Sequence, residues 1–158
     1  HAIYGTSKGK ILMTFFIGCL NLKSQELTVC NASHEQPLIF PNKETLKKSD
    51  ITPLAPPAGP RLGESLKSTY TEEIYHLDPS DRIFFYSDGV TELKNNLGEQ
   101  WSEQKMIRVL LKSFQQGPGI DRALLDLESQ MELFRAGAPL ADDITYFMVD
   151  FKKEKPKD

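Results

Sequence analysis

The chain has 158 residues, of which 39% are hydrophobic and 26% are charged, proportions typical of globular proteins. This composition excludes intrinsic disorder and collagen-like or mucin-like repeats, and the length fits one domain. A formal net charge of −3 disfavours general electrostatic attraction to nucleic acid or to an anionic membrane. The longest apolar stretch, residues 11–20, is about half of the roughly 20 residues that a membrane-spanning helix needs. Membrane insertion is therefore not expected.

The cysteine content and the two ends of the chain indicate the compartment and the domain limits. Cys19 and Cys30 are too few for a disulfide scaffold and form no zinc-site motif. A reduced, cytoplasmic chain is the simpler interpretation. No signal peptide opens the sequence, although it begins with His rather than Met, which suggests a shortened start. We expect residues 1–10 to form a flexible leader and the charged residues 152–158 to form a solvated tail.

The first two predicted strands form a β-hairpin. Residues 11–20 and 27–33 are rich in β-branched and aromatic side chains, and a polar turn separates them. Pairing Leu20 with Leu27 makes the two cysteines diagonal neighbours, which is a poor geometry for a disulfide. A short strand at 37–40 follows.

A long surface loop is predicted next, because half of the chain's ten prolines lie between Pro41 and Pro60. Proline lacks a backbone donor and fixes φ, which disfavours regular strand pairing. Leu46, Ile51 and Leu54 are candidates to hold this loop against the core.

The remaining segments alternate strands with helices. Strands at 73–77 and 82–86 flank an Asp-Pro-Ser-Asp turn, so a second hairpin is predicted. The strand at 82–86 has no polar alternation, which is typical of a central strand covered on both faces. Two amphipathic helices follow, at 102–116 and at 120–136. Ser102 is the predicted N-cap of the first helix. A last strand is predicted at 144–151.

Asp88, Asp142 and Asp143 are the principal candidates for chemistry. Asp88 follows a buried strand and precedes Gly89, which lets the backbone turn sharply, although Asp-Gly is also a common turn dipeptide. Asp142 and Asp143 precede the last strand with no Lys or Arg within four positions, so a cation or hydrogen-bond donors must compensate them unless both face solvent. Two acidic groups at the ends of apolar strands together predict a site for a hard divalent cation.

Other polar residues are weaker candidates. His34 follows the second strand and could act as a base, but a hydrogen-bonded structural role is commoner for a lone histidine. Glu92 could orient a metal-bound water or simply be solvated. The chain lacks a P-loop lysine and a GxSxG motif, which disfavours a P-loop nucleotide site and serine-hydrolase chemistry.

Four blocks stand in a characteristic order: MTFFIGCL (13–20), LTVCNASHEQPL (27–38), DRIFFYSDGVTE (81–92) and ADDIT (141–145). Together they resemble the PPM-type serine/threonine phosphatases of the bacterial sporulation-E and RsbU group, which are protein phosphatase 2C-like. The resemblance implies an α+β fold, an antiparallel β-sandwich flanked by helices.

The same resemblance implies a two-metal centre of Mg²⁺ or Mn²⁺ in which Asp88 and Asp142 are ligands, with Asp143 as the adjacent acid. A metal-activated water would attack phosphoserine or phosphothreonine without a covalent enzyme intermediate. The group typically dephosphorylates anti-sigma-factor antagonists and is controlled by attached sensor or receiver domains, so a similar substrate and upstream domain are expected.

The sequence also departs from the family pattern. Nothing in residues 1–11 resembles the family's upstream Asp-containing segment, and Ser33 stands where glycine is usual. Residues 11–151 are therefore expected to be a partial phosphatase domain whose metal centre is completed by residues absent from this chain, with little turnover in isolation. Unpaired strand edges would favour an edge-paired or strand-exchanged homodimer. The alternative is a non-catalytic partner-binding module with a degenerate phosphatase fold.

Overall fold

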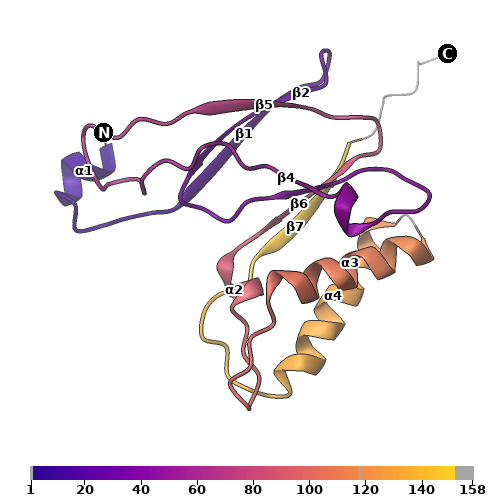
Figure 1. Cartoon of the computed structure of the whole chain (residues 1–158). Helices are drawn as coiled ribbons and strands as arrows, with labels where there is room; N and C mark the ends of the chain where they lie inside the picture. The colour runs from indigo at the N-terminus through magenta and orange to yellow at the C-terminus, as the bar shows by residue number, and fades with distance from the viewer. Residues whose placement is uncertain (1, 118, 152–158) are drawn as a thin grey trace. The chain divides into compact units, whose positions relative to one another are not determined.

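The computed structural model describes residues 2–117 and 119–151 (Figure 1). Contacts divide the chain into two compact units. Unit 1 consists of the residues up to Gln36 together with Pro53–Asp78, and unit 2 consists of Pro37–Thr52 together with the residues from Pro79 onward. The structure confirms the predicted combination of helices with antiparallel sheets.

Unit 1 is built on a three-stranded antiparallel sheet. Its strands are β1 (Phe15–Asn21), β2 (Glu26–Ala32) and β5 (Glu72–His76), in the order β1-β2-β5. Leu20 pairs with Leu27 as predicted, and both cysteines are free. β1 begins later than expected because the Met13 backbone exchanges hydrogen bonds with Leu62 instead of extending the hairpin.

The expected leader contains a helix, α1 (Ala2–Ser7). The Thr6 hydroxyl lies within hydrogen-bond distance of the Ala2 and Ile3 carbonyl oxygens. The sequence of this helix has no apolar periodicity from which it could have been predicted. The predicted tail at 152–158 lies outside the described residues.

Unit 2 contains a second sheet and the two long helices. Its strands are β3 (Leu38–Phe40), β6 (Arg82–Tyr86) and β7 (Tyr146–Asp150), and the sheet order is β4-β3-β6-β7, where β4 is the two-residue strand Thr52–Pro53. β6 lies in the centre, paired with β3 and β7, as its unbroken apolar sequence predicts.

The helices α3 (Glu103–Gln116) and α4 (Ile120–Arg135) pack against each other and cover one face of this sheet (Figure 1). One core cluster joins helices to strands; its largest fully buried members include Phe40, Phe84, Met106, Leu110 and Leu127. Ser102 occupies the predicted cap position, but its side chain makes no capping hydrogen bond, because its φ of 70° turns the chain abruptly into α3.

The predicted second hairpin is wrong. β5 pairs with β2, whereas β6 pairs with β3 and β7. The intervening residues bond to the end of β7 instead: the Ser80 amide donates to the Phe151 carbonyl, and the Phe151 amide donates to the Asp81 carbonyl. Both edges of β6 are occupied by β3 and β7, and the local turn therefore connects two sheets rather than two paired strands.

The proline-rich loop is ordered as predicted. Leu46 and Leu54 are both buried, and Ile51 packs against the core of unit 2. A short 3-10 helix, η1 (Lys48–Asp50), lies within this loop, where Lys43 forms an ion pair with Asp50.

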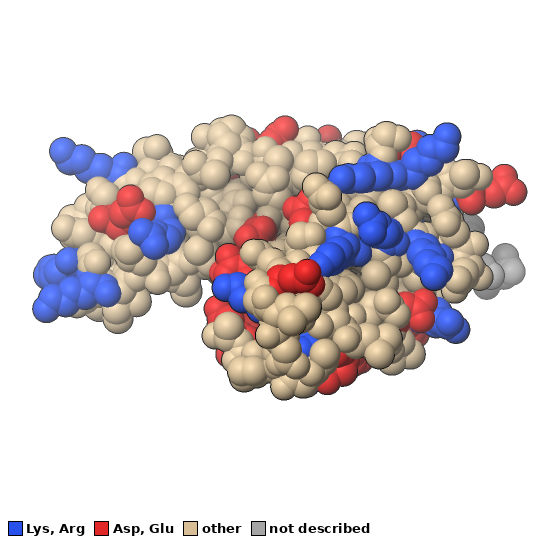
Figure 2. Space-filling view, turned by 60° about the horizontal axis from the view of Figure 1, so that its bottom comes forward, with Lys and Arg blue, Asp and Glu red and all other residues tan. Residues whose placement is uncertain are grey.

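The visible surface carries charges of both signs. Figure 2 shows several Lys and Arg side chains gathered on the right of the face in view, with Asp and Glu side chains scattered around them. The formal net charge of the chain is −3. In the described part of the chain, no helix combines the length and apolarity that crossing a membrane requires.

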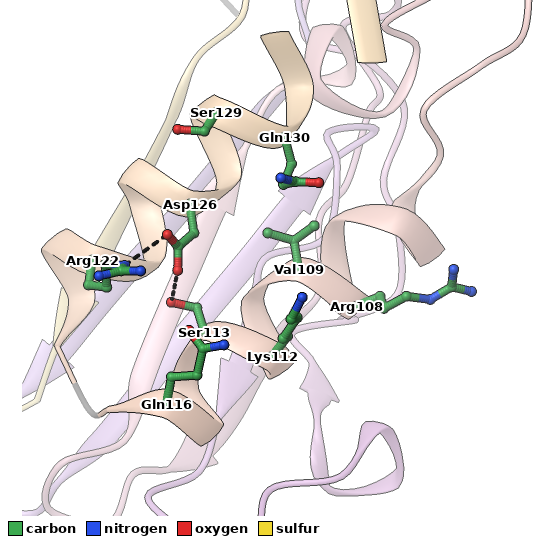
Figure 3. A pocket seen from close by; sticks show the side chains of 9 residues that line it. All are labelled: Arg108, Val109, Lys112, Ser113, Gln116, Arg122, Asp126, Ser129 and Gln130. Atoms are coloured by element: carbon green, nitrogen blue, oxygen red, sulfur yellow. Dashed lines mark hydrogen bonds and ion pairs between the residues drawn. The ribbon is translucent and has the colours of Figure 1, made fainter. Parts of the chain in front are cut away.

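A polar network links α3 to α4 at a hollow of about 410 Å³ (Figure 3). The buried Ser113 hydroxyl donates to the Asp126 carboxylate at 2.8 Å, and Arg122 Nε donates to the same carboxylate at 2.8 Å. The Ser113 hydrogen bond, followed by that of Arg122, lowers the pKa of Asp126. These contacts serve the pairing of the helices, since the hollow lies among α3 and α4 residues only.

A first prediction concerns the core between the helices and the sheet. Leu127 is 0% exposed, whereas Leu125, two positions earlier on α4, is 59% exposed. Leu127→Ala is expected to lower the free energy of unfolding by about 2–5 kcal/mol because it leaves a cavity, and Leu125→Ala by no more than about 0.5 kcal/mol. Urea denaturation followed by circular dichroism measures both, and similar losses would contradict the assigned orientation of α4.

A second prediction concerns pH. Because the pKa of Asp126 lies below its ordinary value of 3.8, its stabilising contribution is present at neutral pH and is lost as pH falls through the lowered pKa. Asp126→Asn should therefore be less stable than wild type at pH 7, and the difference should shrink as pH falls below 3.8 and through the lowered pKa. Thermal midpoints of both proteins across this range test it, and a pH-independent difference would refute it.

Candidate metal centre

The candidate acids stand where β6 ends and β7 begins. Tyr86 pairs with Tyr146, and the pairing continues past the strands, since the Ser87 amide donates to the Thr145 carbonyl at 2.9 Å. The Ser87 hydroxyl accepts from the Thr145 amide at 3.1 Å and donates to the Asp143 carbonyl at 3.3 Å. Ser87 therefore fastens the segment of Asp88 to the segment that precedes β7.

Gly89 allows a second close approach of the same two segments. It lies in the short helix α2 (Asp88–Thr91), and a Cβ at this position would collide with the Asp143 carbonyl oxygen. Its φ is not in the left-handed region, in contrast to Ser33 at 58°. The expected sharp glycine turn at Gly89 is thus corrected: the glycine is needed for backbone contact, and the chain continues as a helix.

The structure brings the segment of Asp88 next to that of Asp142 and Asp143, and all three acids are exposed. One oxygen of Asp88 accepts from the Gly89 amide at 3.0 Å, and one of Asp142 accepts from the Asp143 amide at 2.7 Å. The Asp143 carboxylate makes no hydrogen bond in residues 2–117 and 119–151, and no ion pair there involves any of the three acids.

The donor types suit a hard divalent cation, since exposed carboxylate oxygens are the ligands that Mg²⁺ and Mn²⁺ prefer. No group of three or more His, Cys, Asp or Glu side chains in the described residues is placed to hold an ion by itself. Mg²⁺ commonly retains several waters and uses one or two protein carboxylates with phosphate oxygens. The residues present therefore fit part of such a centre, which needs further oxygen ligands.

The loop that carries Asp142 and Asp143 is anchored at its start. Arg135, at the end of α4, donates to the Ala138 carbonyl at 2.5 Å and forms an ion pair with Glu132 at 2.6 Å. The Asn96 side chain donates to the Ala136 carbonyl at 2.7 Å. Sequence reasoning missed Ser87, Arg135 and Asn96 as positioning residues, because their partners are distant backbone carbonyls that no local pattern reveals.

His34 and Glu92 have local surroundings. The buried Asn31 side chain accepts from the His34 amide at 2.7 Å and donates to its carbonyl at 2.9 Å, while His34 Nδ1 lies 3.0 Å from the Glu35 carbonyl. These contacts give His34 a structural role within unit 1. Glu92 is exposed directly after α2, where its amide donates to the Asp88 carbonyl.

A family model, Stage II sporulation protein E (SpoIIE), matches residues 1–152. The chain belongs to the SpoIIE family. The phosphatase resemblance stated from the sequence blocks is thereby confirmed, and with it membership of the protein phosphatase 2C-like domains.

Known proteins similar to this SpoIIE-family chain are longer than it. Protein IcfG of Synechocystis sp. is 29% identical over 147 residues, which cover 91% of this chain and 22% of IcfG. The RsbU and RsbW domains of Rv1364c from Mycobacterium tuberculosis match with a TM-score of 0.66 and 24% identity, over 90% of this chain and 37% of that one. The chain thus spans about a fifth of its curated relative.

The phosphatase domain of SpoIIE from Bacillus subtilis, in a structure presoaked with Mn, matches with a TM-score of 0.60 and 13% identity, over 91% of this chain and 59% of that one. At this identity the likeness shows the fold alone. The metal-ligand roles of Asp88, Asp142 and Asp143 in the SpoIIE-family chain stay predictions.

The contact at Gly89 generates a third prediction. Gly89→Ala should lower the free energy of unfolding by about 1–3 kcal/mol, because the added methyl forces the Asp143 backbone away. Gly119→Ala is the matched control: it also lies in unit 2, its φ is −73°, and no atom stands within 4 Å of its added Cβ. Urea denaturation of both variants measures the difference, and an equally mild effect at Gly89 would disprove the close approach.

Proposed function

We propose that this SpoIIE-family chain contributes part of the active centre of a metal-dependent serine/threonine phosphoprotein phosphatase. Asp88, Asp142 and Asp143 would be its oxygen ligands for Mg²⁺ or Mn²⁺. The proposal depends on two observations. The segment of Asp88 contacts the segment of Asp142 and Asp143 through backbone atoms and Ser87, and no cationic side chain in the described structure forms an ion pair with the three acids. Exposed carboxylate oxygens without a cationic partner are the kind of ligand that a hard divalent cation prefers.

The arrangement suits phosphate chemistry on a protein substrate. The three carboxylates are exposed, so a phosphoserine or phosphothreonine on another protein can reach them. Asp88 and Asp142 each use one oxygen to hold their own loop, which leaves the other oxygen for a ligand. A divalent cation, when bound, neutralises phosphoryl oxygens and lowers the pKa of a coordinated water.

The serine nearest the acids does not suit the role of a nucleophile. The Ser87 hydroxyl donates its proton to the Asp143 carbonyl and accepts from the Thr145 amide, and no histidine hydrogen bond activates it in the described residues. Direct attack by water, without a phosphoserine intermediate on the enzyme, is therefore the favoured route.

The substrate class follows from the family. The sporulation-E and RsbU group typically acts on anti-sigma-factor antagonists, so we assign a phosphorylated antagonist of this kind as the substrate and an attached sensor or receiver domain as the regulator. The manganese-presoaked structure of the related B. subtilis domain supports a divalent cation as the cofactor.

The fourth prediction tests the acids directly. Asp88→Asn and Asp142→Asn should each reduce Mn²⁺-dependent release of phosphate from p-nitrophenyl phosphate at least 100-fold, because a neutral amide is a poor ligand for a hard cation. The assay uses this chain and the longest natural polypeptide that contains it, and little turnover is expected from the chain alone. Mn²⁺ binding by electron paramagnetic resonance is measured in parallel.

The matched control is Asp121→Asn, an exposed aspartate on α4 that makes no hydrogen bond or ion pair within the described ranges; its activity should equal that of wild type. Unchanged phosphate release in Asp88→Asn would overturn the proposal.

A non-catalytic partner-binding module is the second candidate. It is favoured by the absence, within residues 2–117 and 119–151, of any group of three or more potential metal-ligating side chains. Phosphate release that depends on Mn²⁺ in the longest natural polypeptide would exclude this candidate, whereas phosphoprotein binding without release in that polypeptide would establish it.

A further inference from the structure

A groove in unit 2 adjoins the loop that carries the acids. Its lining residues are Leu93, Glu128, Ser129, Met131, Glu132, Arg135, Leu140, Ile144 and Tyr146, and its volume is about 600 Å³. The buried Leu93 and Met131 form an apolar floor, while Leu140 is 55% exposed and Ile144 and Tyr146 are half-buried. The groove thus offers apolar surface to an incoming side chain.

Glutamates make the rim of the groove acidic. Among the described residues that line the groove, Arg135 is the only cation, and its guanidinium is already engaged by Glu132 and the Ala138 carbonyl. Glu128 makes no ion pair in the part of the chain that the structure describes. Burial, and secondarily the charge of Glu128, raises the pKa of Tyr146, which agrees with an uncompensated negative charge at this rim.

The groove is continuous with the candidate centre along the chain. Leu140 stands two residues before Asp142, and Ile144 directly follows Asp143. An extended residue spans at most about 3.6 Å, so the groove wall begins within roughly 7 Å of the acids measured along the backbone. A peptide whose phosphorylated residue meets the acids would place residues about two to four positions away in the groove.

We propose that this groove is the docking site for the substrate segment that flanks the phosphorylated residue, and that it selects an aliphatic side chain accompanied by a lysine or arginine. This inference rests on the phosphatase function proposed above. The aliphatic side chain would cover Leu93, Met131 and Leu140, and the basic one would pair with Glu128. Specificity would therefore be shared between Leu140, on the loop that supplies the acids, and Glu128 on α4.

The test uses two fluorescein-labelled phosphoserine peptides of equal length. One carries Leu and Lys within four positions of the phosphoserine, and the other carries Ser and Glu at those positions. Fluorescence anisotropy is measured in EDTA on the full chain, so that binding is observed without catalysis. The Leu/Lys peptide is expected to bind at least tenfold more tightly.

Leu140→Ser and Glu128→Lys should each reduce this preference to less than threefold. Leu133→Ser is the matched control, because Leu133 is a 71% exposed leucine on α4 outside the groove, and it should keep the wild-type preference. Equal binding of the two peptides, or an equal loss in Leu133→Ser, would overturn the docking site.

Sedimentation velocity tests whether a second copy of this chain occupies the groove instead of a substrate segment. A dimer that Leu140→Ser dissociates would assign the groove to a second copy of the chain and refute the proposal. If only the proposed phosphatase function is wrong, the longest natural polypeptide will not hydrolyse p-nitrophenyl phosphate, but the chain will still prefer the Leu/Lys peptide.

Discussion

The antiparallel pairing of β6 with β7 is the constraint on which the candidate centre depends. Because the two strands run in opposite directions, the end of one meets the start of the other, and acids from distant parts of the sequence become neighbours. Ser87 extends the pairing beyond the strands, and Gly89 permits a backbone contact that no other residue type would allow. The local geometry is therefore fixed by hydrogen bonds and van der Waals contact, independently of any charge on the acids.

This independence means that the two acidic segments stay joined without an ion pair to any of the three acids in the described residues. The core beneath them, where α3 and α4 cover the sheet, supplies the stability, while Asp88, Asp142 and Asp143 stay exposed and without ion pairs in the described structure. Ion pairs occur elsewhere, for example on α4, where Arg122 and Arg135 each engage an acid of their own helix. In the proposed function, a divalent cation would bind to these unpaired acids.

The same loop connects the proposed chemistry to the proposed recognition. Arg135 and Asn96 hold its beginning, and Ser87 and Gly89 hold its end. Between these anchors the loop carries two exposed acids, and its Leu140 and Ile144 line a groove. A substrate segment in that groove would thus contact the rigid support of the acids, which couples binding to orientation of the phosphorylated residue.

Local patterns in the sequence determined the hairpin register at Leu20 and Leu27, the central position of β6 and the two amphipathic helices, because these depend on side-chain periodicity and burial. The ordered motifs also determined the family, and they named the three acids. Tertiary structure decided what periodicity does not encode: that β5 and β6 belong to different sheets although a favourable turn joins them, that α1 forms, and that Gly89 serves contact rather than turning. The outcomes for β5, β6 and Gly89 depend on partners far away in the chain, and these partners meet only when the sheets assemble.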